Sequence, residues 1–403
     1  MHPYSSFVIH QNQQNPSRLN SLCDFLNNPQ SDQHVSRLGV LEFTQLNSPP
    51  VYRTLDHQSL REVVSEDIVI TEECSLYGRI VLVENISRGI VEILGWALRI
   101  DPSFFEAHIG NKDCSEESML KVGDTPQTFV TWHYPRAITL EGLQGHVGSE
   151  EYVRQLNVYR KVLLLPLAQD NAFDALIQHH CSLSVIDLRG GGWLAAVLIL
   201  VDPPVLNGGL RLTPKSGPEG PILTASDCQL FQYGYEDIRD SDDPEEQNWP
   251  CSPPHERGGS TRPPRDGLFD DLVYYWRNRL APAFEFIDPP ATSFVYYPFE
   301  IAVAEWANSY EAMDLFLQNY QSVLLDNKNK PDNSINQASH PDPNVSILTA
   351  LRRWIMPHIT QRPRDRGYLV NQITAPPLLV DDYEVVINSL EQLSSALETI
   401  LTQ

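Results

Sequence analysis

The chain has 403 residues, 41% of them hydrophobic, so it is long enough and apolar enough to bury a sizeable core. Its 52 acidic and 29 basic residues give a formal net charge of -23, which argues against nucleic acid and anionic lipid surfaces as partners. Six scattered cysteines without a Cys-x-x-Cys pair, no signal peptide and no apolar run of about 20 residues favour a reduced, cytoplasmic protein without membrane insertion.

The beginning of the chain reads differently from the rest. Residues 1–50 are rich in Asn, Gln, Ser and Pro and show no sustained apolar period, so we expect a loosely ordered leader with one short helix over 19–26. Residues 51–325 should form the main α/β domain. Within it, Asp67–Ile70 and Ile80–Val83 have the short β-branched runs of buried strands.

A helix should follow the second of these strands. Ser87 is a suitable N-cap for an apolar face at helical spacing, and the segment closes at Asp101-Pro102. Several strands with few helices between them then predict a mixed sheet. The predicted strands are Thr128–His133, Val158–Leu165, Leu183–Leu188 and Leu194–Val201.

The second half of the domain is interrupted and then turns helical. Residues 235–267 form an acidic, Pro-rich insertion, which we expect to be a mobile loop. Helices are predicted over Leu268–Leu280 and Phe299–Leu325, with a short strand at Ser293–Tyr297 between them.

Long helices should end the chain. A polar linker at 326–346 precedes a segment at 347–403 that reads as stalk-like helices. The first contains Arg352 and Arg353, which we expect to pair with the acidic surface. The last begins near Asp381 and carries one apolar stripe, formed by Tyr383, Val386, Leu390, Leu393, Leu397 and Ile400.

Four stretches, in this order, resemble the fungal CorA-like magnesium transporter family. The most specific is a strand and helix leading into the pattern I-D-P-x-F-F-x-x-H, which ends at His108. The others are a strand ending in Val-Asp-Pro-Pro, an aromatic helix start and an Ala-Glu-Trp helix opening. The stretches are Val81–Ser87 with Ile100–His108, Leu198–Pro204, Phe269–Trp276 and Ala304–Trp306.

The resemblance implies an α/β/α layered cytoplasmic domain with a mixed sheet and long C-terminal helices. In the family those helices lead to a membrane hairpin with a Gly-Met-Asn signature. This sequence has neither before its last residue, Gln403, so conduction is not expected of it. The resemblance also implies Mg²⁺ as a ligand, held by acidic side chains, and association of copies through the C-terminal helices, but it assigns no metal ligand residue by residue.

Two candidate sites follow from the residues themselves. Trp132, His133, Tyr134 and Arg136 place an aromatic wall, an imidazole and a guanidinium near a strand end, as a small-molecule pocket requires, although ordinary packing is the favoured explanation. The acidic run with Asp242, Asp243 and Glu246 has the residue types of a magnesium site. A proline within that run disfavours the rigid geometry of a terpene cyclase, and a solvated charge run explains it too.

Other polar groups have simpler interpretations. His179-His180-Cys181 reads as a surface turn, because neighbouring strand residues point to opposite faces and cannot all bind one metal. Arg189 and the three glycines after it read as a hairpin turn, and Asp270-Asp271 as charges favoured at a helix start. Neither the Gly-x-Ser-x-Gly pattern of hydrolases nor the Rossmann glycine pattern of dehydrogenases occurs.

Three functions therefore stay open. The first is a pore-less CorA-like module that senses divalent cations or regulates a partner. The second is an enzyme of fungal secondary metabolism, a cyclase or pericyclase such as a Diels-Alderase, rather than a hydrolase or oxidoreductase. Such an enzyme would fold a small apolar molecule in a shape-complementary pocket. The third is a scaffold that contacts a partner through the 235–267 insertion.

Overall fold

The computed structural model describes residues 4–16, 18–46, 48–65, 76–110, 121–122, 129–141, 152–154, 156–166, 172–187, 195–205, 211–214, 223–224, 227–230, 267–278, 280–281, 284–286, 289–328, 343–368 and 377–402. The helices are α1 (Tyr4–Gln14), α2 (Asn20–Asn27), α3 (His57–Ser65), α4 (Arg88–Ala97), α5 (Pro102–Ile109), α6 (Leu268–Asn278), α7 (Ala291–Lys328), α8 (Pro343–Tyr368) and α9 (Pro377–Thr402), with the 3-10 turn η1 (Pro29–Asp32). The strands are β1 (Arg37–Phe43), β2 (Val51–Leu55), β3 (Gly78–Glu84), β4 (Lys121–Val122), β5 (Phe129–Glu141), β6 (Tyr152–Arg154), β7 (Arg160–Pro166), β8 (Ala172–Asp187), β9 (Ala195–Val201), β10 (Arg211–Pro214), β11 (Leu223–Thr224) and β12 (Asp227–Leu230).

These strands form one mixed sheet in the order β11-β10-β6-β7-β8-β9-β3-β1-β2, with β5 paired to β8 and both β4 and β12 paired to β5. The pairing of β3 with β9 is parallel and the others are antiparallel. The predicted mixed sheet is therefore confirmed. A parallel pair requires a long crossover connection, and the chain between β3 and β9 supplies α4, α5 and the long antiparallel strands.

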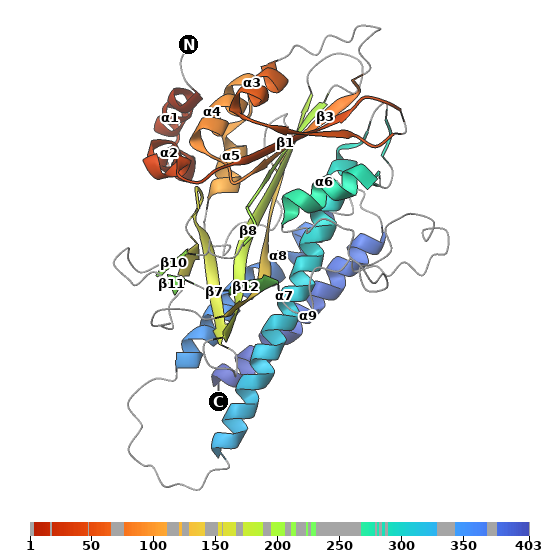
Figure 1. Ribbon diagram of the computed structural model, residues 1–403. Helices are drawn as coiled ribbons and strands as arrows, with labels where there is room; N and C mark the ends of the chain where they lie inside the picture. The colour runs from red at the N-terminus through yellow and green to blue at the C-terminus, as the bar shows by residue number, and fades with distance from the viewer. Residues whose placement is uncertain are drawn as a thin grey trace.

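Helices cover both faces of this sheet, as Figure 1 shows with α1–α5 on one side and α6–α9 on the other. Alternate residues of β3 divide between the two layers. Val81 and Val83 pack into a core with the first five helices, whereas Ile80 and Leu82 pack into a core with the last four. A strand buried on both faces reads as a continuous apolar run, which is why this strand was predictable from sequence.

The N-terminal residues belong to the fold, and the expectation of a loose leader over 1–50 is wrong. Two helices and the strand β1 form there, and β1 pairs with β3 along its full length. Tyr4 is buried, and its hydroxyl donates a hydrogen bond to the carbonyl oxygen of Ile100 at 2.7 Å. The helices bury short apolar faces between amide side chains, too few residues to give a clear period in the sequence.

The segment Ser293–Tyr297 is also corrected, because it forms the first turns of α7 instead of a strand. Its aromatic residues are buried against the sheet and α6, and a short apolar run of this kind suits a buried helix as well as a strand. Pro298 lies inside this helix. The predicted helices around it are confirmed as α6 and the remainder of α7.

The C-terminal helices pack onto the domain. Tyr383, Leu390 and Leu397 of the predicted apolar stripe are buried in the same core as the strand residue Trp132. On α8, Arg352 pairs with Glu398 of α9, as predicted for the acidic surface. No helix among the described residues combines the length and the apolar composition that crossing a bilayer requires.

Helix α7 also covers one edge of the sheet. On the edge of β5 opposite β8, the stretch between the pairings with β4 and β12 has no neighbouring strand in the described part of the chain. There the indole N–H of Trp306 donates to the carbonyl oxygen of His133 at 3.4 Å, and the hydroxyl of Ser309 donates to that of Pro135 at 3.3 Å. Side chains of α7 thus donate to carbonyl groups that would otherwise accept from the N–H groups of another strand.

Several predictions fall outside the described residues. They are the strand Asp67–Ile70, the turn at Arg189–Gly192, the insertion 235–267 up to its last residue, and most of the linker 326–346. Ser87 holds the N-cap position of α4, as predicted, but its side chain makes no capping hydrogen bond. The segment expected to close at Asp101-Pro102 instead starts α5 there, and the Asp101 side chain accepts from the backbone N–H of Ser103.

The contact between α1 and α4 gives a test of the N-terminal packing. A Cβ atom at Gly95 would lie 2.4 Å from the ring of Tyr4, so Gly95→Ala should displace α1 and destabilise the protein by about 1–3 kcal/mol. Hydrogen exchange over residues 4–14 should accelerate. Gly89→Ala in the same helix is the control, because its Cβ would meet only His57 at 3.6 Å. Equal exchange in both variants would contradict this packing.

Candidate functional site

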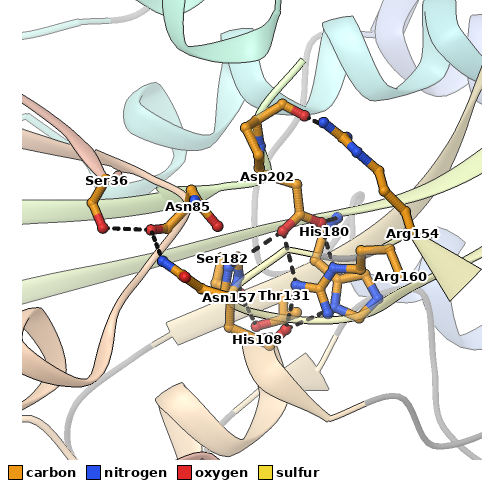
Figure 2. A network of polar contacts seen from close by, with 11 residues as sticks. Ser36, Asn85, His108, Thr131, Arg154, Asn157, Arg160, His180, Ser182 and Asp202 are labelled. Atoms are coloured by element: carbon orange, nitrogen blue, oxygen red, sulfur yellow. Dashed lines mark hydrogen bonds and ion pairs between the residues drawn. The ribbon is translucent and has the colours of Figure 1, made fainter. Parts of the chain in front are cut away.

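A cluster of polar side chains is enclosed where α5 lies on the sheet, and we call it the buried polar centre (Figure 2). Helix α5 contributes one residue, β5 one, β8 two, the start of β7 one, and the residue after β9 one. Every member is at most 3% exposed. The members are His108, Thr131, Arg160, His180, Ser182 and Asp202.

The centre fills an interruption in the sheet. Strand β5 pairs along one edge of β8, so β9 and β7 share the other edge, one after the other. The pairing with β9 ends at Cys181 and the pairing with β7 begins at Ile177. Between them the backbone N–H of His180 donates to Asp202 Oδ2 at 2.7 Å. A side-chain carboxylate therefore replaces a strand carbonyl at this point.

Arg160 neutralises that carboxylate. Its Nε donates to Asp202 Oδ2 at 2.5 Å, and one terminal nitrogen donates to Oδ1 at 3.0 Å, which makes a two-pronged ion pair. The same terminal nitrogen donates to the carbonyl oxygen of His108 at 2.9 Å, at the end of α5. The ion pair thus links the start of β7, the end of β9 and the last turn of a helix.

Two hydroxyl groups connect His108 to the sheet. Thr131 donates to Ser182 Oγ at 2.9 Å, and Ser182 Oγ lies at hydrogen-bond distance, 3.0 Å, from Nδ1 of His108. The other ring nitrogen, Nε2, faces Asp202 Oδ1 at 4.0 Å, beyond hydrogen-bond distance.

A hydrogen bond to the same helix orients the ring of His180. Its Nδ1 donates to the carbonyl oxygen of His108 at 2.8 Å, and its ring stacks on His133, with ring centroids 3.7 Å apart and planes 7° apart. Burial lowers the pKa of both His108 and His180 well below the usual value, and the charge of Arg160 adds to the shift. Both imidazoles are therefore neutral near pH 7.

The row Ser182, His108, Asp202 has the residue types of a catalytic triad but not its working geometry. Both the serine and the histidine are 0% exposed, so no substrate reaches the hydroxyl. The carboxylate makes no hydrogen bond to the imidazole, because Arg160 and a backbone N–H occupy it. The centre is arranged to hold elements together, and its chemistry is hydrogen bonding.

The imidazoles of this region do not form a metal centre either. In the part of the chain that the structure describes, no group of three or more His, Cys, Asp or Glu side chains is placed to hold a metal ion. Asp242, Asp243 and Glu246, the residues singled out for magnesium, lie outside that part.

The predicted pocket residues all lie on β5, and they are buried. Trp132 and Tyr134 point into the core shared with α7, whereas His133 stacks on His180 on the other face of the sheet. Arg136 forms a buried ion pair with Glu305 of α7, with 3.4 Å between Nε and Oε1. Burial raises the pKa of Glu305, and the nearby guanidinium of Arg136 opposes the shift. A binding role for these residues stays a prediction.

The expectation of a surface turn at His179-His180-Cys181 is wrong. All three residues lie inside β8 and are at most 2% exposed. His179 points away from His180 and stacks on Tyr134, as alternation along a strand requires. Burial, outweighing the opposing charge of Asp202, lowers the pKa of His179 to about 3.

Sequence reasoning did not assign a role to Arg160 or Ser182. His108 and Asp202 entered the sequence analysis only as members of two of its four singled-out stretches, Ile100–His108 and Leu198–Pro204. Asp202 follows an apolar strand directly and His108 closes a helix, but nothing in one sequence shows that the two meet. No protein-family model matches the chain, and no curated protein shows significant similarity to it.

The first prediction from this centre concerns its ion pair. Asp202→Asn leaves the charge of Arg160 buried without a counter-charge, so the free energy of unfolding should fall by about 3–5 kcal/mol. Chemical denaturation checks this. Glu398→Gln breaks the exposed pair with Arg352 and should change stability by less than about 1 kcal/mol. Similar losses in the two variants would contradict the role of the buried pair.

The second concerns acid sensitivity. His179 has a pKa of about 3 when folded and an ordinary one of 6.5 when unfolded, so below pH 6.5 only the unfolded chain gains this proton. Stability should therefore fall by up to about 1.4 kcal/mol per pH unit from this residue alone. His179→Phe should flatten the slope between pH 6.5 and 5, while His10→Gln on the exposed face of α1 should not. An unchanged slope in His179→Phe would refute this.

Proposed function

We propose that the protein is a non-catalytic regulatory module that responds to divalent cations in the cytoplasm. One observation carries the proposal: in the described part of the chain, the serine, histidine and carboxylate whose residue types match a catalytic triad are enclosed in the buried polar centre. His108, Ser182 and Arg160 are each 0% exposed and are occupied by one another or by backbone groups. Such a centre stabilises a fold and gives substrates no access.

The charge of the chain supports a cation as the signal. A net charge of -23 produces a negative field that concentrates divalent ions near the surface and opposes compaction. Exposed carboxylates occur on both helical layers, for example Glu62 on α3 and Glu311 on α7. Ligands of this kind bind weakly, with dissociation constants on the order of a millimolar. The resemblance to the CorA-like cytoplasmic domain favours Mg²⁺ as this divalent ion.

The alternatives receive less support. A cyclase or pericyclase requires an apolar cavity open to substrate, but the residues proposed for one are buried. Trp132, Tyr134 and Arg136 pack on the α7 side of β5, and His133 stacks on His180 on the other side. The scaffold hypothesis depends on the 235–267 insertion, which lies almost wholly outside the described residues.

The test is a titration with MgCl₂ against NaCl at equal ionic strength. A tenfold excess of Mg²⁺ over its dissociation constant should add about 1.4 kcal/mol to the free energy of unfolding, and the effect should saturate. Thermal unfolding and light scattering follow stability and association together. A variant with Asp242, Asp243 and Glu246 replaced by amides shows whether the acidic run binds the ion. If Mg²⁺ acts no differently from NaCl and the protein stays monomeric, the proposal fails.

A further inference from the structure

A buried carboxylate lies at the carboxyl end of β3, apart from the polar centre. Glu84 is the last residue of that strand and is 7% exposed. Its Oε2 is enclosed and has no hydrogen-bond partner in the described part of the chain. An ionised carboxylate needs compensation for lost hydration, so this position favours the neutral form.

Four charged groups face Glu84, each from a different element. They are Arg37 of β1, Asp270 of α6, Arg154 of β6 and Asp202 after β9. Arg154 donates hydrogen bonds to the carbonyl oxygens of Pro203 and Pro204. Asp202 is held by Arg160, as described above.

Arg37 is the group that connects Glu84 to a helix. Its two terminal nitrogens donate to the carboxylate of Asp270, at 3.0 and 2.5 Å, in the first turn of α6. Its guanidinium also lies 4.3 Å from the ring centroid of Phe269. Arg37 is also opposite Glu84 in the pairing of β1 with β3, so the residue that binds α6 is the cross-strand neighbour of the buried carboxylate.

We propose that Glu84 is a proton-operated switch for the docking of α6 on the sheet. When Glu84 is neutral, Arg37 pairs with Asp270 undisturbed and ties the helix to β1. When Glu84 is ionised, its carboxylate competes for Arg37 and repels Asp270, so the helix is held less firmly. This device does not depend on the proposed cation response.

The direction of the pH response follows from the position of the group. Burial, together with Asp270, raises the pKa of Glu84 from 4.5 to about 7, against the opposing charges of Arg37 and Arg154. With α6 undocked, Glu84 meets water and its pKa returns toward 4.5. The docked state therefore has its full advantage below pH 4.5 and loses it as the pH rises to 7.

Hydrogen exchange on the full chain tests the switch. Opening of residues 268–278, corrected for intrinsic exchange, should increase about tenfold or more from pH 5 to pH 7.5 in the wild-type protein. In Glu84→Gln the side chain is always neutral, and opening should stay constant over this range. Helix α9 serves as the reference segment and Glu62→Gln on α3 as the matched control. The same pH response in Glu84→Gln as in wild type would overturn the proposal.

A second variant keeps the test valid if Glu84→Gln does not fold. Asp270→Asn removes the competitor for Arg37, so Glu84 pairs with the guanidinium and its pKa falls. The pH at which α6 loosens should then move below the wild-type midpoint by about one unit. A midpoint that does not move would also overturn the switch.

Discussion

The structure depends on how the gap along one edge of β8 is filled. Two strands share that edge, and the backbone between them would lack a partner in a dry interior, which costs as much as a lost hydrogen bond. Asp202 supplies the missing acceptor but brings a negative charge. Arg160 cancels the charge, and its remaining donor capacity fixes the end of α5. The buried charge of Asp202 thus requires Arg160, and Arg160 in turn binds α5.

Continuous apolar runs gave the most reliable predictions. β3 and β9 are buried on both faces, so residues 80–83 of the first and 195–201 of the second are all Val, Ile, Leu or Ala, and α9 shows its stripe because only one face is covered. The prediction of a strand at Ser293–Tyr297 was wrong because a five-residue apolar run has no measurable period. The buried centre could not be predicted, since His108 and Asp202 lie far apart in sequence and only the fold brings them together.

The four stretches singled out in the sequence analysis share a structural property. Each contributes a contact between elements: Asp202 to Arg160, Asp270 to Arg37, Glu305 to Arg136, and His108 to Ser182. These contacts tie strands of the sheet to one another and to α5, α6 and α7.

The cover that α7 provides for β5 has a consequence for behaviour in solution. An uncovered strand edge can accept a strand from another molecule, and that is how many β-rich proteins begin to aggregate. Trp306 and Ser309 occupy the carbonyl groups that such a strand would use. The long helix therefore blocks the pairing of another chain with this stretch of β5, and any event that lifts it would expose the strand edge to such pairing.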